Sequence, residues 1–163
     1  MPTSNPTDIL LAHDTWATRN IVDACSTLND EQFHERFEMG QGSLHDVLTH
    51  VITVMRVWTD MLASREAQPR LEPSTRRSPA ELLSLLDESA IDLAHHVRAH
   101  PPDGILSRER GGKTYSFTRG AVLTHVTTHG MHHRAQCLNM LRHLGVNPLP
   151  QSSVIEWTWT ADL

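Results

Sequence analysis

Four long stretches of helical periodicity limit the folds open to this chain more than any other feature. They cover residues 6–28, 43–67, 78–100 and 118–144. Asn5 precedes the first stretch, while Ser43 and Ser78 open the second and third, and all three are good helix N-caps. Pro69 and Gly145 mark the ends of the second and fourth stretches. Four amphipathic helices bury their apolar stripes most simply against one another, so the sequence predicts an all-α four-helix bundle.

The segments between these helices are predicted to be loops, except for one hairpin. Residues 29–42 and 68–77 have the composition of ordinary loops. Gly111-Gly112 lies between two runs of alternating residues, a pattern typical of a short β-hairpin between the third and fourth helices. The amphiphilic run Val154–Trp159 is predicted to pack back on the bundle as a short helix or an extended strap.

Composition narrows the class of protein further. A chain of 163 residues with 39% hydrophobic and 20% charged residues fits one globular domain over residues 1–163. A net charge of −5 disfavours a nucleic-acid partner. No apolar run approaches the roughly 20 residues that span a bilayer, and the N-terminus has no signal-peptide pattern. Cys25 and Cys137 make no disulfide framework, so we expect a cytoplasmic protein without a membrane partner.

Helical phase distinguishes among the histidines of the fourth stretch. The chain has twelve histidines, so a pair one turn apart is weak evidence by itself. At about 100° per residue, His129 and His133 fall inside the apolar stripe, whereas His125 and His132 lie toward its edge. The rest of the stripe is Val122, Val126, Cys137, Met140 and Leu144. Imidazoles in such positions need polar partners, because burying them unsatisfied is costly.

His50 supplies a third imidazole from another helix. It shares the apolar face of the second stretch with Val47, Val54, Val57 and Met61. Facing helices of a bundle bring such side chains within reach of one ion. Neutral imidazoles from His50, His129 and His133 would hold a divalent metal and leave positions open for water or substrate, the pattern of a catalytic site. Zn or Ni is the expected metal, while Fe, Mn and Cu stay open.

Three further residues are candidates to orient a ligand or to contact substrate: Arg134, Gln136 and His13. Gln136 faces inward, whereas Arg134 could equally form a surface or interhelical salt bridge, and His13 a backbone or water contact. A purely structural bundle stays open too, because a single His on an apolar face is usually a satisfied core residue. The histidines interpreted as surface or helix-end residues are His34, His45, His95, His96 and His100.

At these residues the chain resembles the DinB/YfiT-like family of proposed metalloenzymes, over nearly its whole length. The similarity rests on His13-Asp-Thr-Trp16-Ala-Thr-Arg-Asn20, on Gly42-Ser-Leu-His-Asp-Val-Leu-Thr-His50 with Arg56-Val-Trp58 after it, and on His129-Gly-Met-His-His133-Arg134-Ala135-Gln136. The last segment is similar to the family signature His-x-x-x-His-Arg-Gly-Gln, with Ala135 in place of the Gly. The resemblance implies a four-helix bundle with a metal triad at His50, His129 and His133. Relatives in this family include thiol S-transferases that use bacillithiol or glutathione-like thiols, and a mycothiol-dependent maleylpyruvate isomerase.

The resulting hypothesis is a metal-dependent enzyme that activates a low-molecular-weight thiol or water, similar to the thiol S-transferases. We expect a small-molecule substrate and a homodimer. No Glu follows His129, unlike the His-Glu-x-x-His motif, so a zincin-type hydrolase is disfavoured. The alternative is a non-enzymatic metal- or ligand-binding stress-response protein.

Overall fold

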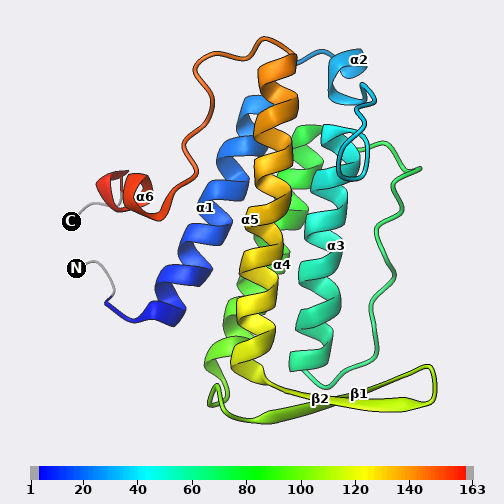
Figure 1. Ribbon diagram of the computed structural model, residues 1–163, viewed down its shortest axis with the longest axis vertical. Helices are drawn as coiled ribbons and strands as arrows, with labels where there is room; N and C mark the ends of the chain where they lie inside the picture. Colours follow the sequence, from blue (N-terminus) through cyan, green and yellow to red (C-terminus); the bar gives the residue numbers. More distant parts are fainter. Residues whose placement is uncertain (1–3, 161–163) are drawn as a thin grey trace.

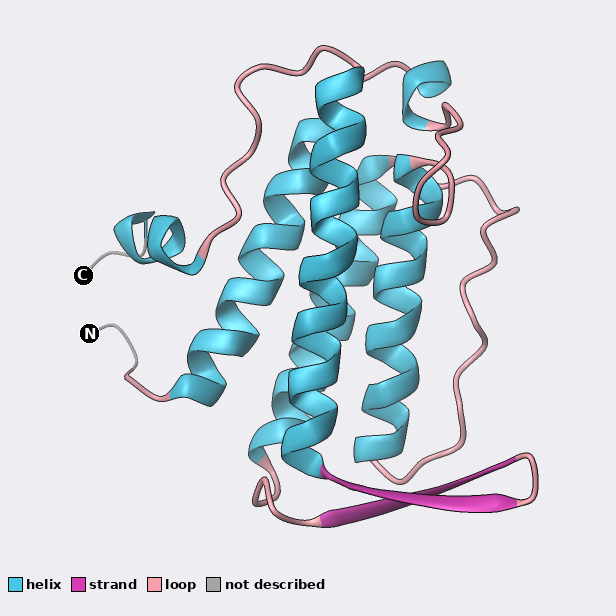
Figure 2. Ribbon diagram, in the orientation of Figure 1, coloured by secondary structure: helices cyan, strands magenta, loops and turns pink. Residues whose placement is uncertain are grey.

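The computed structural model describes residues 4–160 and is mostly helical, with one small two-stranded sheet (Figure 1, Figure 2). The elements are α1 (Pro6–Cys25), α2 (Asp30–Phe33), α3 (Leu44–Leu62), α4 (Pro79–Arg98), β1 (Ile105–Arg110), β2 (Lys113–Thr118), α5 (Arg119–His143) and α6 (Val154–Thr160). The four long helices lie side by side: α1 packs against α4 and α5, and α3 packs against the same two helices. None of the described helices is long and apolar enough to cross a membrane.

Capping side chains fix where the long helices begin. The side chains of Asn5 and Ser43 each accept a hydrogen bond from a backbone N–H of the first turn, at 2.9 and 3.1 Å. Ser78 and Glu81 form a reciprocal capping box at the start of α4, and Thr118 caps α5. These contacts satisfy N–H groups that have no partner within the helix. The predicted helix starts are therefore confirmed.

The end of α3 differs from the prediction. The helix ends at Leu62 rather than near residue 67, because Ser64 adopts a left-handed conformation with φ of 51°. The Arg65 N–H then donates back to the Asp60 carbonyl at 3.1 Å, which closes the last turn. This bond is half of the Schellman arrangement that Gly usually forms. A Gly at this position would have marked the end of the helix in the sequence, but the residue is Ser64.

The connections bear out one prediction and correct another. The hairpin is present, with β1 and β2 antiparallel and Gly111-Gly112 at the turn, both at positive φ. The predicted loop 29–42, however, contains the one-turn helix α2. Asn29 and Gln32 form its capping box. A helix of only four residues is too short for its sequence pattern to be distinguished from that of an ordinary turn. Of the two forms predicted for the C-terminal segment, the short helix is present as α6, and it packs on α1.

A hydrophobic core lies between the four long helices. The predicted apolar stripe of α5 is confirmed, with Val122, Val126 and Met140 buried. Of the stripe predicted for α3, Val47 is fully buried, whereas Val54, Val57 and Met61 are half-buried. The other deeply buried residues of α3 include Leu44, Leu48, Ile52 and Met55. The difference arises because α3 is apolar over a broad arc, so its sequence pattern fits more than one stripe. His50 consequently lies at the edge of the core.

Candidate metal centre

Three histidine rings converge where α3 meets α5. The Nε2 atom of His129 lies 3.1 Å from Nε2 of His50 and 3.1 Å from Nε2 of His133. One ligand atom from each residue lies within 4.8 Å of the other two. Among the described residues, this is the one group of three or more metal-ligating side chains so arranged. The structure thus brings together the three histidines that helical phase selected.

Two features of the helices produce this convergence. His129 and His133 are one turn apart on α5, so their rings leave the same side of the helix. The packing of α3 against α5 then brings the His50 ring to 4.7 Å from the His133 ring, between centroids. His133 is buried, whereas His50 and His129 are half-buried. The site is therefore at the rim of the core, where a bound ion would face solvent on one side.

The surroundings of these rings favour neutral imidazole. Burial, followed by the neighbouring rings of His133 and His50, lowers the pKa of His129 from 6.5 to about 4. Burial also lowers the pKa of His50 and that of His133. Desolvation acts against the charged form of an imidazole, and neighbouring rings that can become positive add to the effect. Near neutral pH all three rings keep the lone pair that a metal needs.

Gln136 orients the innermost of these rings. The Nδ1–H of His133 donates to the Gln136 side-chain carbonyl at 2.7 Å. This contact puts the proton on Nδ1 and leaves Nε2 of His133 free to accept a metal. The Gln136 amide N–H in turn donates to Nε2 of His132 at 3.2 Å. Gln136 thus has the contact expected of a residue that orients a metal ligand.

Arg134 and His13 do not join the cluster. Arg134 is buried and pairs with Asp14 of α1, and it donates to the Thr18 hydroxyl at 3.1 Å. The interhelical salt bridge is therefore the interpretation of Arg134 that the structure supports. His13, also buried, donates from Nε2 to the Ser152 carbonyl at 2.9 Å and so ties α1 to the segment before α6. That is the backbone contact considered for it from the sequence.

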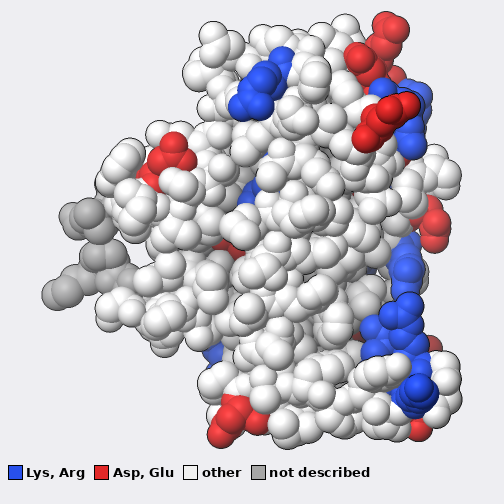
Figure 3. All heavy atoms as spheres, viewed as in Figure 1, with Lys and Arg blue, Asp and Glu red and all other residues white. Residues whose placement is uncertain are grey.

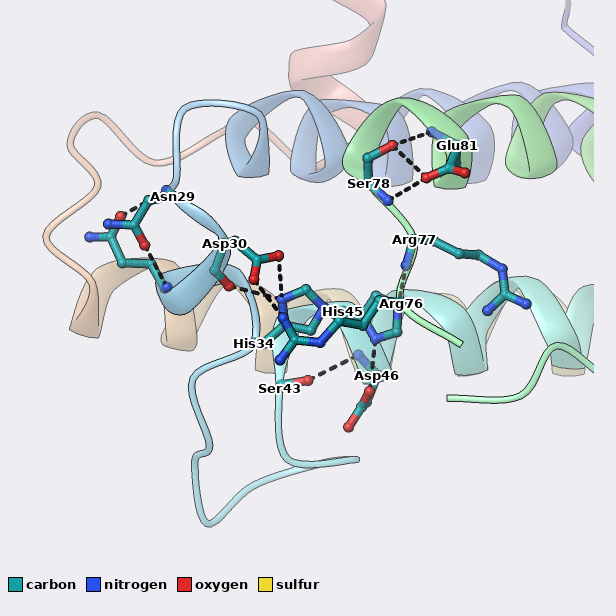
Figure 4. Close-up of polar contacts among 11 residues, drawn as sticks. Asn29, Asp30, His34, Ser43, His45, Asp46, Arg76, Arg77, Ser78 and Glu81 are labelled. Carbon is teal, nitrogen blue, oxygen red and sulfur yellow. Dashed lines mark hydrogen bonds and ion pairs between the residues drawn. The ribbon is translucent and has the colours of Figure 1, made fainter. Parts of the chain in front are cut away.

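His45 lies at a helix end, one of the two placements predicted for it, but it is not a surface residue. It is fully buried at the start of α3, and its ring lies 4.7 Å from that of His34 (Figure 4). Nδ1–H donates to the Asp46 carboxylate at 2.9 Å, and Nε2 accepts the backbone N–H of Arg77 at 3.2 Å. The second partner belongs to the loop before α4. Only the fold reveals that contact, so local sequence around His45 carried no signal for it.

Two further features near the histidines were not apparent from the sequence. The His125 ring lies 5.7 Å from His129 and 5.0 Å from Trp58, so an aromatic group flanks the cluster. Gly40, in the loop before α3, packs against the Gln136 side chain.

On the face in view in Figure 3, charged side chains gather mainly at the periphery, and the middle is mostly uncharged. A groove of about 630 Å³ lies elsewhere, between α1 and α4, and includes none of the three ligands.

The donor set fits a divalent transition metal. Zn–N bonds of 2.0–2.1 Å in tetrahedral geometry place two ligand nitrogens about 3.3 Å apart, close to the 3.1 Å separations here. Three neutral imidazoles suit Zn, Ni, Fe or Cu and disfavour Mg or Ca, which prefer oxygen. No cysteine belongs to the group, so a closed structural zinc site does not match it. Three histidines can therefore hold an ion while leaving at least one position open.

The fold and the site together describe a mostly helical protein in which three histidines from neighbouring helices converge. The chain belongs to the DinB family, whose model matches residues 1–161. A comparison with curated proteins gave no match.

Solved structures agree with this assignment at the level of the fold. A DinB-like protein from Bacillus cereus ATCC 10987 is similar with a TM-score of 0.69 and 16% identity, over 87% of this chain and 92% of that one. The DinB-like protein YjoA from Bacillus subtilis has a TM-score of 0.63 and 14% identity, over 88% of this chain and 96% of its own. At such low identity, the likeness concerns the fold alone.

Proposed function

We propose that this chain is a single-domain four-helix-bundle metalloenzyme that uses a divalent ion to activate a low-molecular-weight thiol or water. The observation that carries the proposal is the convergence of the Nε2 atoms of His50, His129 and His133. Their neutral state supports it, since a lowered imidazole pKa removes the proton that would compete with the metal. Zn or Ni is the proposed ion.

An ion held there would supply Lewis-acid chemistry, lowering the pKa of a coordinated thiol or water. The three histidines bring no negative charge to the site, so the full positive charge of the ion would act on the nucleophile. Gln136 holds the ring of His133 in the tautomer that presents Nε2. Beside the cluster, the rings of Trp58 and His125 meet edge to face with centroids 5.0 Å apart, and they would offer the substrate an aromatic contact.

The proposed reaction is transfer of the thiol sulfur to a small electrophile. The sulfur loses its proton, forms a bond to the electrophilic carbon, and the leaving group departs with its electron pair. The net charge of −5 supports a substrate other than a polyanion. A homodimer is also proposed. The exposed apolar residues Ile155 and Trp159 on α6 support it, and light scattering in solution would test it.

The test is consumption of a model electrophile by a panel of low-molecular-weight thiols, with and without Zn or Ni. We expect turnover that requires the metal and is lost in His129→Ala. His95→Ala is the control, because His95 is exposed on α4 and outside the cluster. Tight metal binding without turnover for any thiol or for hydrolysis would instead favour a non-enzymatic metal-binding stress-response protein. A ligand-binding stress-response protein, the other form of that alternative, would use the groove between α1 and α4, which lies apart from the histidines.

A further inference from the structure

The loop between α2 and α3 is held in place beside the metal ligands. The Phe37 N–H donates to the Gly42 carbonyl at 2.6 Å, and the Gly42 N–H donates to the Met39 carbonyl at 3.0 Å. From α5, the Asn139 amide donates to the Met39 sulfur at 3.6 Å. These bonds close a tight turn and fasten it to α5. Gly40 lies at the tip of that turn, so its position is defined from both sides.

A side chain at position 40 would fit only if Gln136 moved. Its φ is +55°, and a Cβ atom there would lie well inside the van der Waals distance of the Gln136 carbonyl oxygen. The same atom would lie 3.0 Å from Cδ of Gln136 and 3.2 Å from Cγ2 of Val47. Gln136 belongs to α5 and Val47 to α3. The backbone of Gly40 is therefore wedged between the two helices that carry the histidines.

The atom that a Cβ at position 40 would meet first, the Gln136 carbonyl oxygen, is also the hydrogen-bond acceptor for His133. The Gln136 carbonyl oxygen receives the Nδ1–H of His133 at 2.7 Å, while the amide nitrogen contacts His132. The side chain has only a narrow range of positions that satisfy both bonds. A displaced oxygen would leave Nδ1 of His133 without its acceptor, and the ring could then carry its proton on Nε2.

We propose that Gly40 is a positioning residue of the metal centre, acting through Gln136 to fix the tautomer and orientation of His133. The inference rests on the proposed function for its role in metal binding, although the tautomer itself is a property of the metal-free protein. A side chain at position 40 moves the Gln136 oxygen, and the ring of His133 then presents a protonated nitrogen to the ion. Through Gly40, the loop before α3 thus helps to fix the orientation of the His133 ring.

A simpler role would be that Gly40 only supplies a left-handed turn. Gly111 separates the two possibilities, because its φ is +59° and a Cβ atom there would meet nothing within 4 Å. Gly40→Ala and Gly111→Ala therefore introduce nearly the same backbone strain. Only the first variant introduces a contact with Gln136, so any difference at His133 comes from that contact.

The first experiment reads the His133 tautomer directly, by nitrogen-15 NMR of the metal-free protein at pH 8. We expect the Nδ1–H form in the wild type and in Gly111→Ala, and a mixture with the Nε2–H form in Gly40→Ala and in Gln136→Ala. An unchanged Nδ1–H form in Gly40→Ala would overturn the inference. Because no metal is present, this result does not depend on the proposed function.

The second experiment titrates each protein with cobalt(II) alone and follows the visible absorption of the bound ion. Residues that hold a metal-ligating histidine typically contribute 10–100-fold to affinity, so we expect Gly40→Ala to bind about tenfold more weakly than Gly111→Ala. Equal affinities of these two variants would overturn the inference. No binding by the wild type would contradict the proposed function instead, and the NMR result would still decide the role of Gly40.

A double variant keeps the inference testable if Gly40→Ala folds poorly. Removing the Gln136 side chain in Gln136→Ala takes away the closest obstacle to a Cβ atom at position 40. Adding Gly40→Ala to Gln136→Ala should then change neither the urea midpoint, beyond the shift of Gly111→Ala, nor the cobalt affinity. An equally large loss in both backgrounds would show that the contact with Gln136 is not the cause, and would overturn the inference.

Discussion

The buried ion pair between α1 and α5 offers the sharpest test of the packing. The side chains of Arg134 and Asp14 are only 4% and 3% exposed. Arg134 also donates to the Thr18 hydroxyl, and the second carboxylate oxygen of Asp14 is buried with no hydrogen-bond partner among residues 4–160. Arg134→Met keeps most of the aliphatic volume but leaves that carboxylate with no compensating charge. Breaking one side of a buried pair costs about 3–5 kcal/mol, and we expect a loss of that size.

Urea unfolding at two pH values tests both the size and the cause of this loss. With an m-value of about 2 kcal/mol/M, the loss lowers the midpoint by about 2 M. Burial raises the pKa of Asp14 above 3.8 even beside Arg134, and removing the cation raises it further. A raised folded-state pKa means stability is lost as pH rises through it, so the deficit of Arg134→Met should be larger at pH 7 than at pH 5.

Two comparisons complete this prediction. Arg19→Met is the control, because the Arg19–Asp87 pair between α1 and α4 is 39% exposed on each side. Such surface pairs contribute about 0–1 kcal/mol. In Asp14→Asn/Arg134→Met the buried charge is gone, so at least half of the lost stability should return. A deficit below about 1 kcal/mol, or one that is equal at pH 5 and pH 7, would refute the reasoning.

Two further predictions concern α5. Gly130→Ala should lower stability by about 1–3 kcal/mol in thermal or urea unfolding, although Ala normally stabilises a helix interior, because its Cβ would lie 2.6 Å from the Asp14 carboxylate and 2.8 Å from the Arg134 guanidinium. A gain in stability would contradict the packing described. Because the pKa of His129 falls from 6.5 to about 4 on folding, the unfolded chain binds more protons between these values. The metal-free protein should therefore lose stability as pH falls from 6.5 to 4, and His129→Ala should flatten this dependence; an unchanged slope would contradict it.

Local sequence determined where the helices begin far better than where they end. Asn5, Ser43 and Ser78 cap the first turn from within three residues of the N–H groups they satisfy, so the pattern is complete in the sequence. The end of α3 depends on Ser64 in a conformation that Gly normally takes. One residue choice among several acceptable ones decides it, and the good helix formers Arg65, Glu66 and Ala67 follow it in the sequence. The helix boundary was therefore predicted too late.

The three histidines could be selected from the sequence because their arrangement depends mainly on helical phase. His129 and His133 are neighbours on one helix, and His50 needs only that α3 and α5 pack together. The pair of Asp14 with Arg134, by contrast, joins residues 120 positions apart. The burial of His45 likewise depends on the backbone of Arg77. No local pattern encodes these contacts, so they became visible only once the helices were packed.

The most direct test of the account is the metal content of protein purified without an affinity tag and loaded with Zn or Ni. Elemental analysis of the wild type and of His95→Ala should give about one ion per chain. His50→Ala, His129→Ala and His133→Ala should each lose most of it under the same conditions, because each removes one of three converging Nε2 ligands. Less than about 0.1 ion per wild-type chain, or full occupancy in all three variants, would contradict a three-histidine metal centre.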